Sequence, residues 1–494
     1  MVRIVRRRIP FSGRAGEGPA TWAQRQMWRL IQQRMPDSAF YDHSLGCELP
    51  GGLTLEDVLS QIARLVERHD SLRTLFRYED GVLTQRVVGS GLLDVAVLLA
   101  DGAEEPHSRD LFLAHQAEMC GTGFDLAAEP PFRPLVGLVD GTPRGLGFCV
   151  PHVAADLPAS RIVIEELRTA LTAVAAGEPP PVLPAARRPL DEAAFERSER
   201  GRALNEAALR HWRAQLARLP PTMFPGPGVA AADPRFQSGA LESRAMRLAL
   251  DTLAARYRVS VSAVALTAIA AVLGAYSGLP RCGLQLIVGN RFVPELRRAV
   301  LNAIQEVPVA VDLRAGTFQE VARATFRTAL AAYRNARYDP DDADSLVAEA
   351  GRARGAAIEL GCYFNDIRRP AEPGAVAAAA TAEEVRAAVP ASRFAATDPQ
   401  EREAAYFVLM DTPDVLSGRS ASVVLELCAD TRHIPPPVIE EVLRGVERLL
   451  VAAVEREIGP EELPAATGVT PAGGGGPAQP ARAGRLPVAE GGAA

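Results

Sequence analysis

The residues best suited to chemistry in this sequence are a histidine and an aspartate four positions apart, His152 and Asp156. None of the other six histidines is followed by an aspartate at this spacing. An imidazole can accept a proton from an attacking amine or hydroxyl near neutral pH, and a carboxylate in the same loop can fix the geometry of that loop. His152 follows a strand-like run, residues 146–150, and catalytic side chains often lie where a rigid strand ends. These residues are equally compatible with a strand-end histidine that only satisfies the backbone, so both interpretations stay open.

The composition excludes several other kinds of enzyme. The sequence contains no lysine, so all 54 of its basic Lys and Arg residues are arginines. This removes the lysine of a P-loop, the strand lysine of a protein kinase and a lysine Schiff base with pyridoxal phosphate. The six cysteines form no C-x-x-C pair and no Cys/His cluster at zinc spacing. We expect them to be small buried hydrophobic residues in a reducing compartment.

The charge pattern argues against a polyanionic partner. The net charge is −6, with no basic excess to attract nucleic acid or an anionic membrane. The arginines at positions 6–8 are followed by no apolar run, so they do not open a signal peptide. Residues 259–276 are uncharged and long enough to span a membrane, but their mild hydrophobicity favours a helix buried in a large core. We predict a cytoplasmic protein that binds neither nucleic acid nor membrane.

The elements around His152 indicate an α/β fold. Thr54 and Asp57 form a capping box that opens a helix with apolar residues at helical spacing. The strand of residues 146–150 and a helix with Ile162 and Val163 facing inward lie on either side of the His152 loop. The proline-rich run 178–190 then breaks the periodicity and indicates a linker.

The second half repeats this alternation of helices and strands. We predict strands near residues 283–289, 306–313, 358–364, 406–410 and 422–428, a helix capped by Thr317 and a last helix opened by Pro435, Pro436 and Pro437. Residues 369–403 lack a clean period and are predicted to be a surface loop. The chain therefore divides into an N-terminal lobe (1–180), a linker with a connecting helix (181–235), a C-terminal lobe (236–460) and a disordered tail (461–494).

Several stretches resemble one known family. Residues 21–30 read TWAQRQMWRL, and residues 68–76 read RHDSLRTLF. These are similar to the motifs S-x-A-Q-x-R-M-W-x-L and R-H-E-x-L-R-T-x-F of the condensation domains of nonribosomal peptide synthetases. His152 to Asp156 falls where that family carries its active-site motif, H-H-x-x-x-D-G. Further likeness is found at residues 289–296, 307–313, 363–365 and 425–450, so the resemblance runs from about residue 20 to 455.

The resemblance implies a fold and a reaction. The fold would be α/β, with two chloramphenicol-acetyltransferase-like lobes arranged as a V around a central tunnel. His152 would promote attack of an amine or hydroxyl acceptor on an acyl thioester carried by the phosphopantetheine arm of a carrier protein. Asp156 would support the site structurally by pairing with an arginine of the other lobe, for which Arg291 is the candidate, since a buried carboxylate needs a partner. No adenylation or carrier segment is visible, so the domain would be freestanding and its carrier would act in trans.

Two departures from the family motif keep other functions open. Pro151 replaces the first histidine of the motif, and Leu157 replaces its closing glycine. Proline removes a backbone donor and a polar side chain at once, and leucine adds bulk where glycine leaves the backbone accessible. The first hypothesis is a condensation-type acyltransferase that forms an amide or ester in secondary-metabolite assembly. The second is a degenerate condensation-like domain that binds a carrier protein or a tailoring enzyme, and the third is an acyltransferase that takes its acyl group from CoA.

Overall fold

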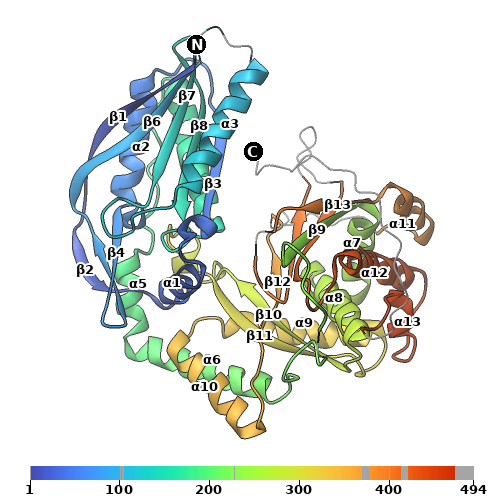
Figure 1. The fold of residues 1–494 in the computed structure, drawn as a ribbon. Helices are drawn as coiled ribbons and strands as arrows, with labels where there is room; N and C mark the ends of the chain where they lie inside the picture. Colours follow the sequence, from blue (N-terminus) through green and yellow to red (C-terminus); the bar gives the residue numbers. More distant parts are fainter. Residues whose placement is uncertain are drawn as a thin grey trace. The chain divides into compact units, whose positions relative to one another are not determined.

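The structure, a computed structural model, divides the chain into two compact units (Figure 1). It describes residues 2–100, 102, 105–226, 228–369, 379–399, 401–412 and 421–472. Among the described residues, unit 1 contains those up to 205 together with 289–305, and unit 2 contains 206–288 and 306–472. The first boundary falls inside helix α6 (Glu199–Leu216), within the range 181–235 that the sequence analysis assigns to a linker with a connecting helix.

Unit 1 is built on a five-stranded sheet with the order β1-β6-β7-β8-β3. Only the β6/β7 pair is parallel among the four pairs of neighbouring strands. A second, three-stranded sheet has the order β2-β5-β4. The strands are β1 (Val2–Ser12), β2 (Gly16–Pro19), β3 (Asp42–Glu48), β4 (Thr74–Glu79), β5 (Val82–Val87), β6 (Ser90–Ala100), β7 (Arg133–Val139) and β8 (Thr142–Pro151).

Helices cover both faces of the five-stranded sheet. Helices α2 and α4 pack against each other and against β1, β3 and β8, while α3 packs against β3, β7 and β8 from the opposite face (Figure 1). Alternation along β8 separates these contacts, since Leu146, Phe148 and Val150 enter the core with α2 and α4 while Gly147 lies under Gln116 of α3. The helical segments are α1 (Trp22–Arg34), η1 (Ser38–Tyr41), α2 (Leu55–Arg68), η2 (Asp70–Arg73), α3 (Glu105–Gly121), α4 (Leu157–Ala175), α5 (Pro189–Glu196) and α6.

The predicted elements of unit 1 are present. Helix α2 begins after the capping box, in which the Thr54 hydroxyl accepts from the Asp57 backbone N–H at 3.2 Å. Its residues Val58, Ile62 and Val66 are fully buried, as the helical spacing predicted. The strand and helix on either side of His152 are β8 and α4.

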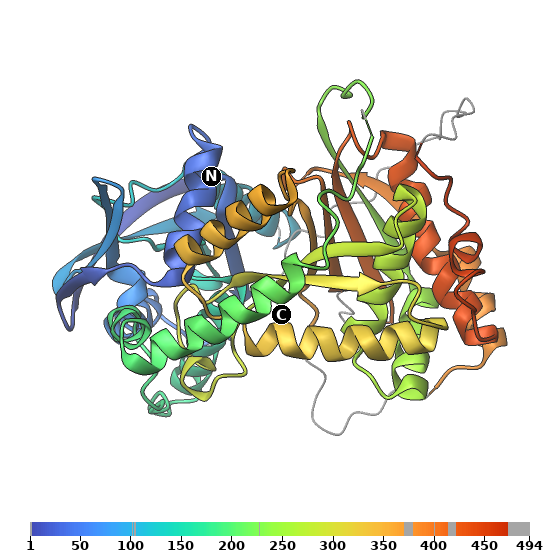
Figure 2. The ribbon, with the colours of Figure 1, turned by 90° about the horizontal axis from the view of Figure 1, so that it is seen from below.

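Unit 2 is built on a seven-stranded mixed sheet with the order β11-β10-β12-β14-β15-β9-β13. The pairs β10/β12 and β12/β14 are parallel, and the pairs β14/β15, β15/β9 and β9/β13 are antiparallel. Helices α7, α8 and α12 lie together on one face of this sheet, in both views (Figures 1 and 2). The elements are β9 (Phe236–Ser243), α7 (Arg244–Tyr257), α8 (Val261–Ser277), β10 (Arg281–Val288), η3 (Pro294–Leu296), β11 (Gln305–Asp312), α9 (Phe318–Arg334), α10 (Pro340–Arg354), β12 (Cys362–Asp366), α11 (Ala382–Ala388), η4 (Val389–Ala391), β13 (Arg393–Thr397), β14 (Ala405–Asp411), β15 (Val423–Asp430), α12 (Pro436–Glu455) and α13 (Leu463–Thr467).

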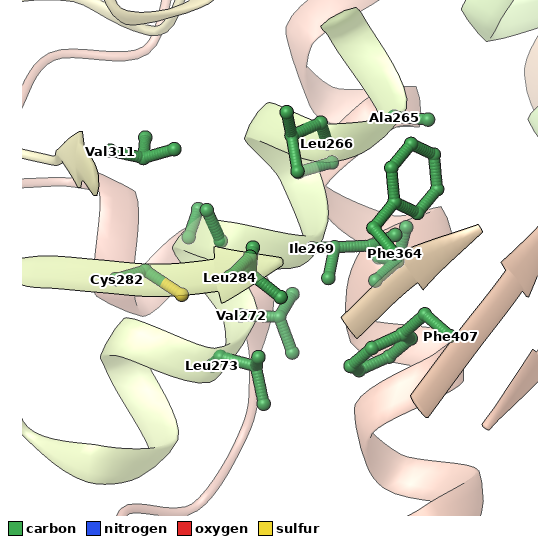
Figure 3. Packing of buried hydrophobic residues seen from close by; sticks show 14 of the residues in the cluster. Ala265, Leu266, Ile269, Val272, Leu273, Cys282, Leu284, Val311, Phe364 and Phe407 are labelled. Atoms are coloured by element: carbon green, nitrogen blue, oxygen red, sulfur yellow. The ribbon is translucent and has the colours of Figure 1, made fainter. Parts of the chain in front are cut away.

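Helix α8 explains the uncharged stretch of the second half. Figure 3 shows its side chains Leu266, Ile269 and Leu273 packed in a cluster with Phe364 of β12 and Phe407 of β14. The helix is apolar on all sides because it is buried within unit 2. Within the described ranges no single helix is long and apolar enough to cross a membrane, and only the bent pair α7 and α8 passes that test together, by length and composition.

Three predictions about the chain need correction. The segment 369–403, predicted to be a loop, contains α11 and β13; here β13 pairs with β9 at the sheet edge, and residues 370–378 and 400 lie outside the described residues. The predicted tail begins too early, because α13 packs against α8 and α12, while residues 473–494 lie outside the described residues. The cysteines are not all free: Cys120 of α3 and Cys149 of β8 form a disulfide, since the packing of α3 on the sheet places their Cα atoms 5.4 Å apart. Their sequence separation of 29 residues gave no sign of this pairing.

Candidate functional site

The site is built around the end of strand β8. This strand pairs with β7 on one side and β3 on the other, so its end is held from both directions. After the last strand residue, Pro151, the His152 backbone N–H donates to the Tyr41 carbonyl at 3.2 Å. The backbone N–H groups of Ala154 and Ala155 donate to the Pro151 carbonyl and close a tight, buried turn. The His152 side chain therefore projects from a rigid scaffold.

The His152 imidazole is half-buried, and its two nitrogens have different surroundings. The Nδ1 atom is buried and has no hydrogen-bond partner among the described residues. Burial lowers the pKa of His152, while the Asp156 carboxylate and the residue's own backbone carbonyl oppose this shift. The ring is therefore neutral at physiological pH and can act as a base through Nε2.

Asp156 is fully buried and each of its oxygens is engaged. It is the N-cap of α4, and its Oδ1 accepts from the Ala159 backbone N–H at 2.8 Å. The same Oδ1 accepts from the Arg291 guanidinium at 2.6 Å. Oδ2 accepts from the backbone N–H of Ala303 at 2.9 Å. These bonds leave Asp156 no role in proton transfer, but they connect the start of α4 to the segment 289–305.

Arg291 holds that segment in a fixed shape. Its Nη1 donates to the carbonyls of Leu296 and Ala299 at 2.8 and 2.6 Å, and its Nη2 donates to the Leu301 carbonyl at 2.9 Å. The segment connects β10 to β11, yet it packs with unit 1, where Val300 enters the hydrophobic core. The predicted Asp156 and Arg291 ion pair is thus present. The arginine, however, belongs to the same compact unit as the aspartate, not to the predicted C-terminal lobe.

The two motif departures lie on either side of this arrangement. Pro151 is buried at the end of β8, opposite Asp42 of β3. Leu157 is the first residue of α4 and is half-buried, as is His152. Proline at a strand end and leucine at the first helical position both suit the local backbone. Neither departure disturbs the cap or the ion pair of Asp156.

Sequence reasoning missed a second histidine of the site. His43 of β3 lies opposite Val150 in the strand register, and its ring centroid is 5.6 Å from that of His152. Its Nε2 is 2.7 Å from the hydroxyl oxygen of Ser160, a fully buried residue of α4. Burial and the neighbouring His152 lower the pKa of His43 to about 3. No spacing along the chain could reveal this pair, because strand pairing alone brings residues 43 and 152 together.

The histidine of the second sequence motif has a structural role. His69 is buried, and its Nε2 lies 2.8 Å from the Glu166 carboxylate of α4. Arg68 donates to the same carboxylate and to the carbonyls of Leu183 and Pro184. These contacts attach α2 to α4 and to the proline-rich segment. Within the described residues no group of three or more His, Cys, Asp or Glu side chains could hold a metal ion.

Comparisons with known proteins agree with the sequence motifs. The family model described as "Condensation domain" matches residues 14–355, more than half of the chain. The isonitrile lipopeptide synthase of Mycobacterium tuberculosis is 27% identical over 329 residues, which cover 64% of this chain and 13% of that protein. This chain therefore spans only a small part of the length of that relative.

Two solved structures share the fold. The starter condensation domain of rhizomide synthetase in complex with C8-CoA has a TM-score of 0.67 and 15% identity, covering 90% of this chain and 96% of that one. The X-domain in its complex with OxyB from teicoplanin biosynthesis has a TM-score of 0.64 and 20% identity, covering 90% and 95%. The mixed α/β architecture of two sheet-based units is that of these domains. With the family match over residues 14–355, the chain belongs to the condensation-domain family of nonribosomal peptide synthesis.

Proposed function

We propose that this domain joins a carrier-bound acyl group to an amine or hydroxyl acceptor, with His152 as the general base. The acceptor nitrogen or oxygen bonds to the thioester carbonyl carbon while its proton passes to Nε2 of His152. The carbon–sulfur bond then breaks, and the thiolate of the phosphopantetheine arm takes the proton from the imidazolium. The product is an amide or an ester, and the imidazole returns to its neutral form.

One observation carries this proposal: a half-buried, neutral imidazole stands at the end of a strand held on both sides. A base must be unprotonated at the pH of the reaction, and burial supplies that condition for His152. The buried Nδ1 leaves Nε2 as the nitrogen that can meet an acceptor. Asp156 and Arg291 then serve as structural support, since their mutual contacts fix the helix that follows the His152 turn.

The experiment is intact-mass analysis of a carrier protein loaded with an acyl group, incubated with this protein and candidate amines and alcohols. We expect the acyl mass to leave the carrier and an amide or ester to appear. His152→Ala should lower the rate by at least ~100-fold without loss of folding. His115→Ala is the matched control, because His115 lies on α3, which packs on the opposite face of the sheet. Equal rates for His152→Ala and the unmodified protein would refute the proposal.

The acyl donor divides the proposal into two versions. We favour a carrier-bound thioester, supplied by a carrier in trans as the sequence analysis expects. An acyl-CoA is the other version, since the rhizomide synthetase domain was solved with C8-CoA. Offering the same acyl group on a carrier and on CoA separates them, because transfer from CoA at an equal or higher rate would favour the CoA-dependent acyltransferase.

A second candidate function is recruitment without chemistry. Pro151 and Leu157 change two positions of the active-site motif, and the X-domain that shares this fold was solved bound to OxyB. A domain of this kind would bind a carrier protein or a tailoring enzyme and leave the acyl group in place. In the same assay it would form a stable complex with the loaded carrier, visible by size-exclusion chromatography, with no change in acyl mass.

The predicted cytoplasmic location belongs to the same proposal. Cell fractionation, with detection of the full chain by antibody, tests it directly. Enrichment outside the cytoplasmic fraction would contradict it.

A further inference from the structure

Strand pairing places a second imidazole beside His152. Strands β3 and β8 are antiparallel, with His43 opposite Val150 and Asp42 opposite Pro151. Directly opposed residues project on the same face of a sheet, and so do residues two apart on one strand. His43 therefore shares the face of Val150, toward α4, and His152 lies just past the strand end on that side.

The contact between the two rings is specific. Their centroids are 5.6 Å apart and their planes meet at 69°, the edge-to-face geometry that aromatic rings prefer. The other edge of the His43 ring meets α4, where Nε2 lies 2.7 Å from the Ser160 hydroxyl oxygen. The Ser160 backbone N–H in turn donates to the Asp156 carbonyl at 2.9 Å. His43 is thus anchored to the same first turn of α4 that Asp156 caps. Ser160 itself is fully buried, which excludes it as a nucleophile.

We propose that His43 is a positioning residue for His152, a second imidazole supplied by β3. This inference rests on the proposed role of His152 as a base. The His43 ring forms one wall of the His152 site, restricts rotation of the His152 ring and excludes water from its buried side. It touches neither substrate nor reacting atoms in this role, and it acts only through His152.

The charges around the pair set the direction of its effect. Asp156, at the start of α4, favours protonation of His152, and the Tyr41 carbonyl favours protonation of His43. Burial is the largest influence on both rings, and a proton on His152 disfavours one on His43. Arg291 is held against Asp156 and offsets its charge. Asp42 is the neighbouring carboxyl on β3, and its electrostatic partners are Arg133, Glu129 and Asp37.

Removal of His43 should therefore raise the pKa of His152. In His43→Ala, water enters the vacated space beside His152, and this hydration favours the charged form of His152. The acidic limb of the rate profile would then move to higher pH, and kcat would fall by ~10-fold while KM changes little. His43→Phe keeps a packed ring that excludes water, so its shift in the pKa of His152 should be smaller. Ser160→Ala removes the contact that holds His43 against α4. Its shift in the pKa of His152 should lie between those of His43→Ala and His43→Phe.

The experiment titrates the imidazoles by NMR in the full chain, labelled at the histidine ring carbons. The chain has seven histidines, and the His152 signal is assigned by its absence in His152→Ala. We expect the midpoint of His152 to move upward by about one pH unit in His43→Ala, and to stay in place in the His115→Ala control. Transfer from a loaded carrier is measured on the same variants as a function of pH.

Each outcome has a meaning. An unchanged midpoint and unchanged transfer in His43→Ala would overturn the inference. A shifted midpoint in a protein that transfers no acyl group, with or without the substitution, would support the imidazole pair and overturn the proposed function instead. If His43→Ala fails to fold, His43→Phe and Ser160→Ala carry the test, because both preserve the volume of the core to within a few atoms. If the titration midpoint of His152 were unchanged in both of these variants, the inference would be overturned.

Discussion

Two carboxyl groups near His152 show how burial and pairing decide the charge of a residue. Asp156 is fully buried and is met by a guanidinium and two backbone N–H groups, so its negative charge is compensated. Asp42 is also largely removed from water, but its Oδ2 has no hydrogen-bond partner among the described residues. Burial therefore raises the pKa of Asp42 to about 7, although Arg133 opposes the shift. Asp156 is thus buried with a charged partner, whereas ionisation of Asp42 lowers the stability of the fold.

Asp42→Asn should stabilise the protein in a pH-dependent manner. Because its pKa is raised in the folded state, Asp42 contributes stability below its ordinary value of 3.8, and this contribution is lost as the pH rises through about 7. Asparagine is neutral throughout, so the variant should gain up to about 4 kcal/mol over the unmodified protein at pH 8 and almost nothing at pH 4. Urea unfolding of both proteins at the two pH values measures this. An equal difference at pH 4 and pH 8 would contradict the assignment.

Arg291→Ala should be strongly destabilising. It leaves the buried Asp156 carboxylate without its charged partner and removes three bonds to the carbonyls of segment 289–305. Loss of one member of a buried pair costs about 3–5 kcal/mol. Arg297→Ala is the matched control, since Arg297 belongs to the same segment and is exposed. Comparable unfolding midpoints in urea for the two variants would show that the ion pair contributes little.

At the scale of the element, helices that begin with a clear cap were the most predictable part of the molecule. The capping boxes at Thr54 and Thr317 open α2 and α9 where the sequence analysis expected them. The segment around β13 was not predictable in this way, because an edge strand of five residues has too few positions to show a period. The packing of α3 against β8 could not be predicted from the sequence either. Glycines at 137, 145 and 147 let α3 approach the sheet closely, and that approach brings Cys120 to Cys149.

The Cys120 and Cys149 disulfide should stabilise unit 1. It closes a loop of 29 residues, for which the entropy of the unfolded chain predicts about 3–4 kcal/mol. Cys120→Ser should lower the free energy of unfolding by this amount, and reductant should then have no further effect. Thiol titration of the denatured, unreduced protein provides an independent count. Four reactive thiols are expected, and six would show that the bond does not form.

At the scale of the whole molecule, the chain order and the compact units do not coincide. Segment 289–305 lies between two strands of unit 2, yet it packs with unit 1 through Val300 and through the Asp156 and Arg291 pair. The sequence contained the residues of this pair and the family motif around them, so the pair itself could be predicted. The compact unit to which Arg291 belongs could not be predicted. The local sequence pattern does not indicate which hydrophobic core a connecting segment packs against. For the same reason His43, brought to the site by strand pairing, escaped notice.

Asp156→Asn should loosen this segment selectively. The variant retains a helix cap but loses the ion pair, so the backbone amides of residues 289–305 and of the first turn of α4 should exchange with solvent at least ~10-fold faster. Backbone amides in β10 and β11, which are hydrogen-bonded within the sheet of unit 2, should keep their hydrogen-exchange rates. Hydrogen exchange followed by mass spectrometry resolves these regions. A uniform increase over the whole chain would instead indicate global destabilisation.

The most direct test of this account compares the unmodified protein with His152→Ala in a single turnover. A carrier protein bearing one acyl group is mixed with excess enzyme and an amine, and the mass of the carrier is followed with time at pH 7.5. The account predicts loss of the acyl mass with concurrent formation of the amide, and a rate at least ~100-fold lower for a folded His152→Ala protein. Transfer at the same rate by both proteins would contradict it.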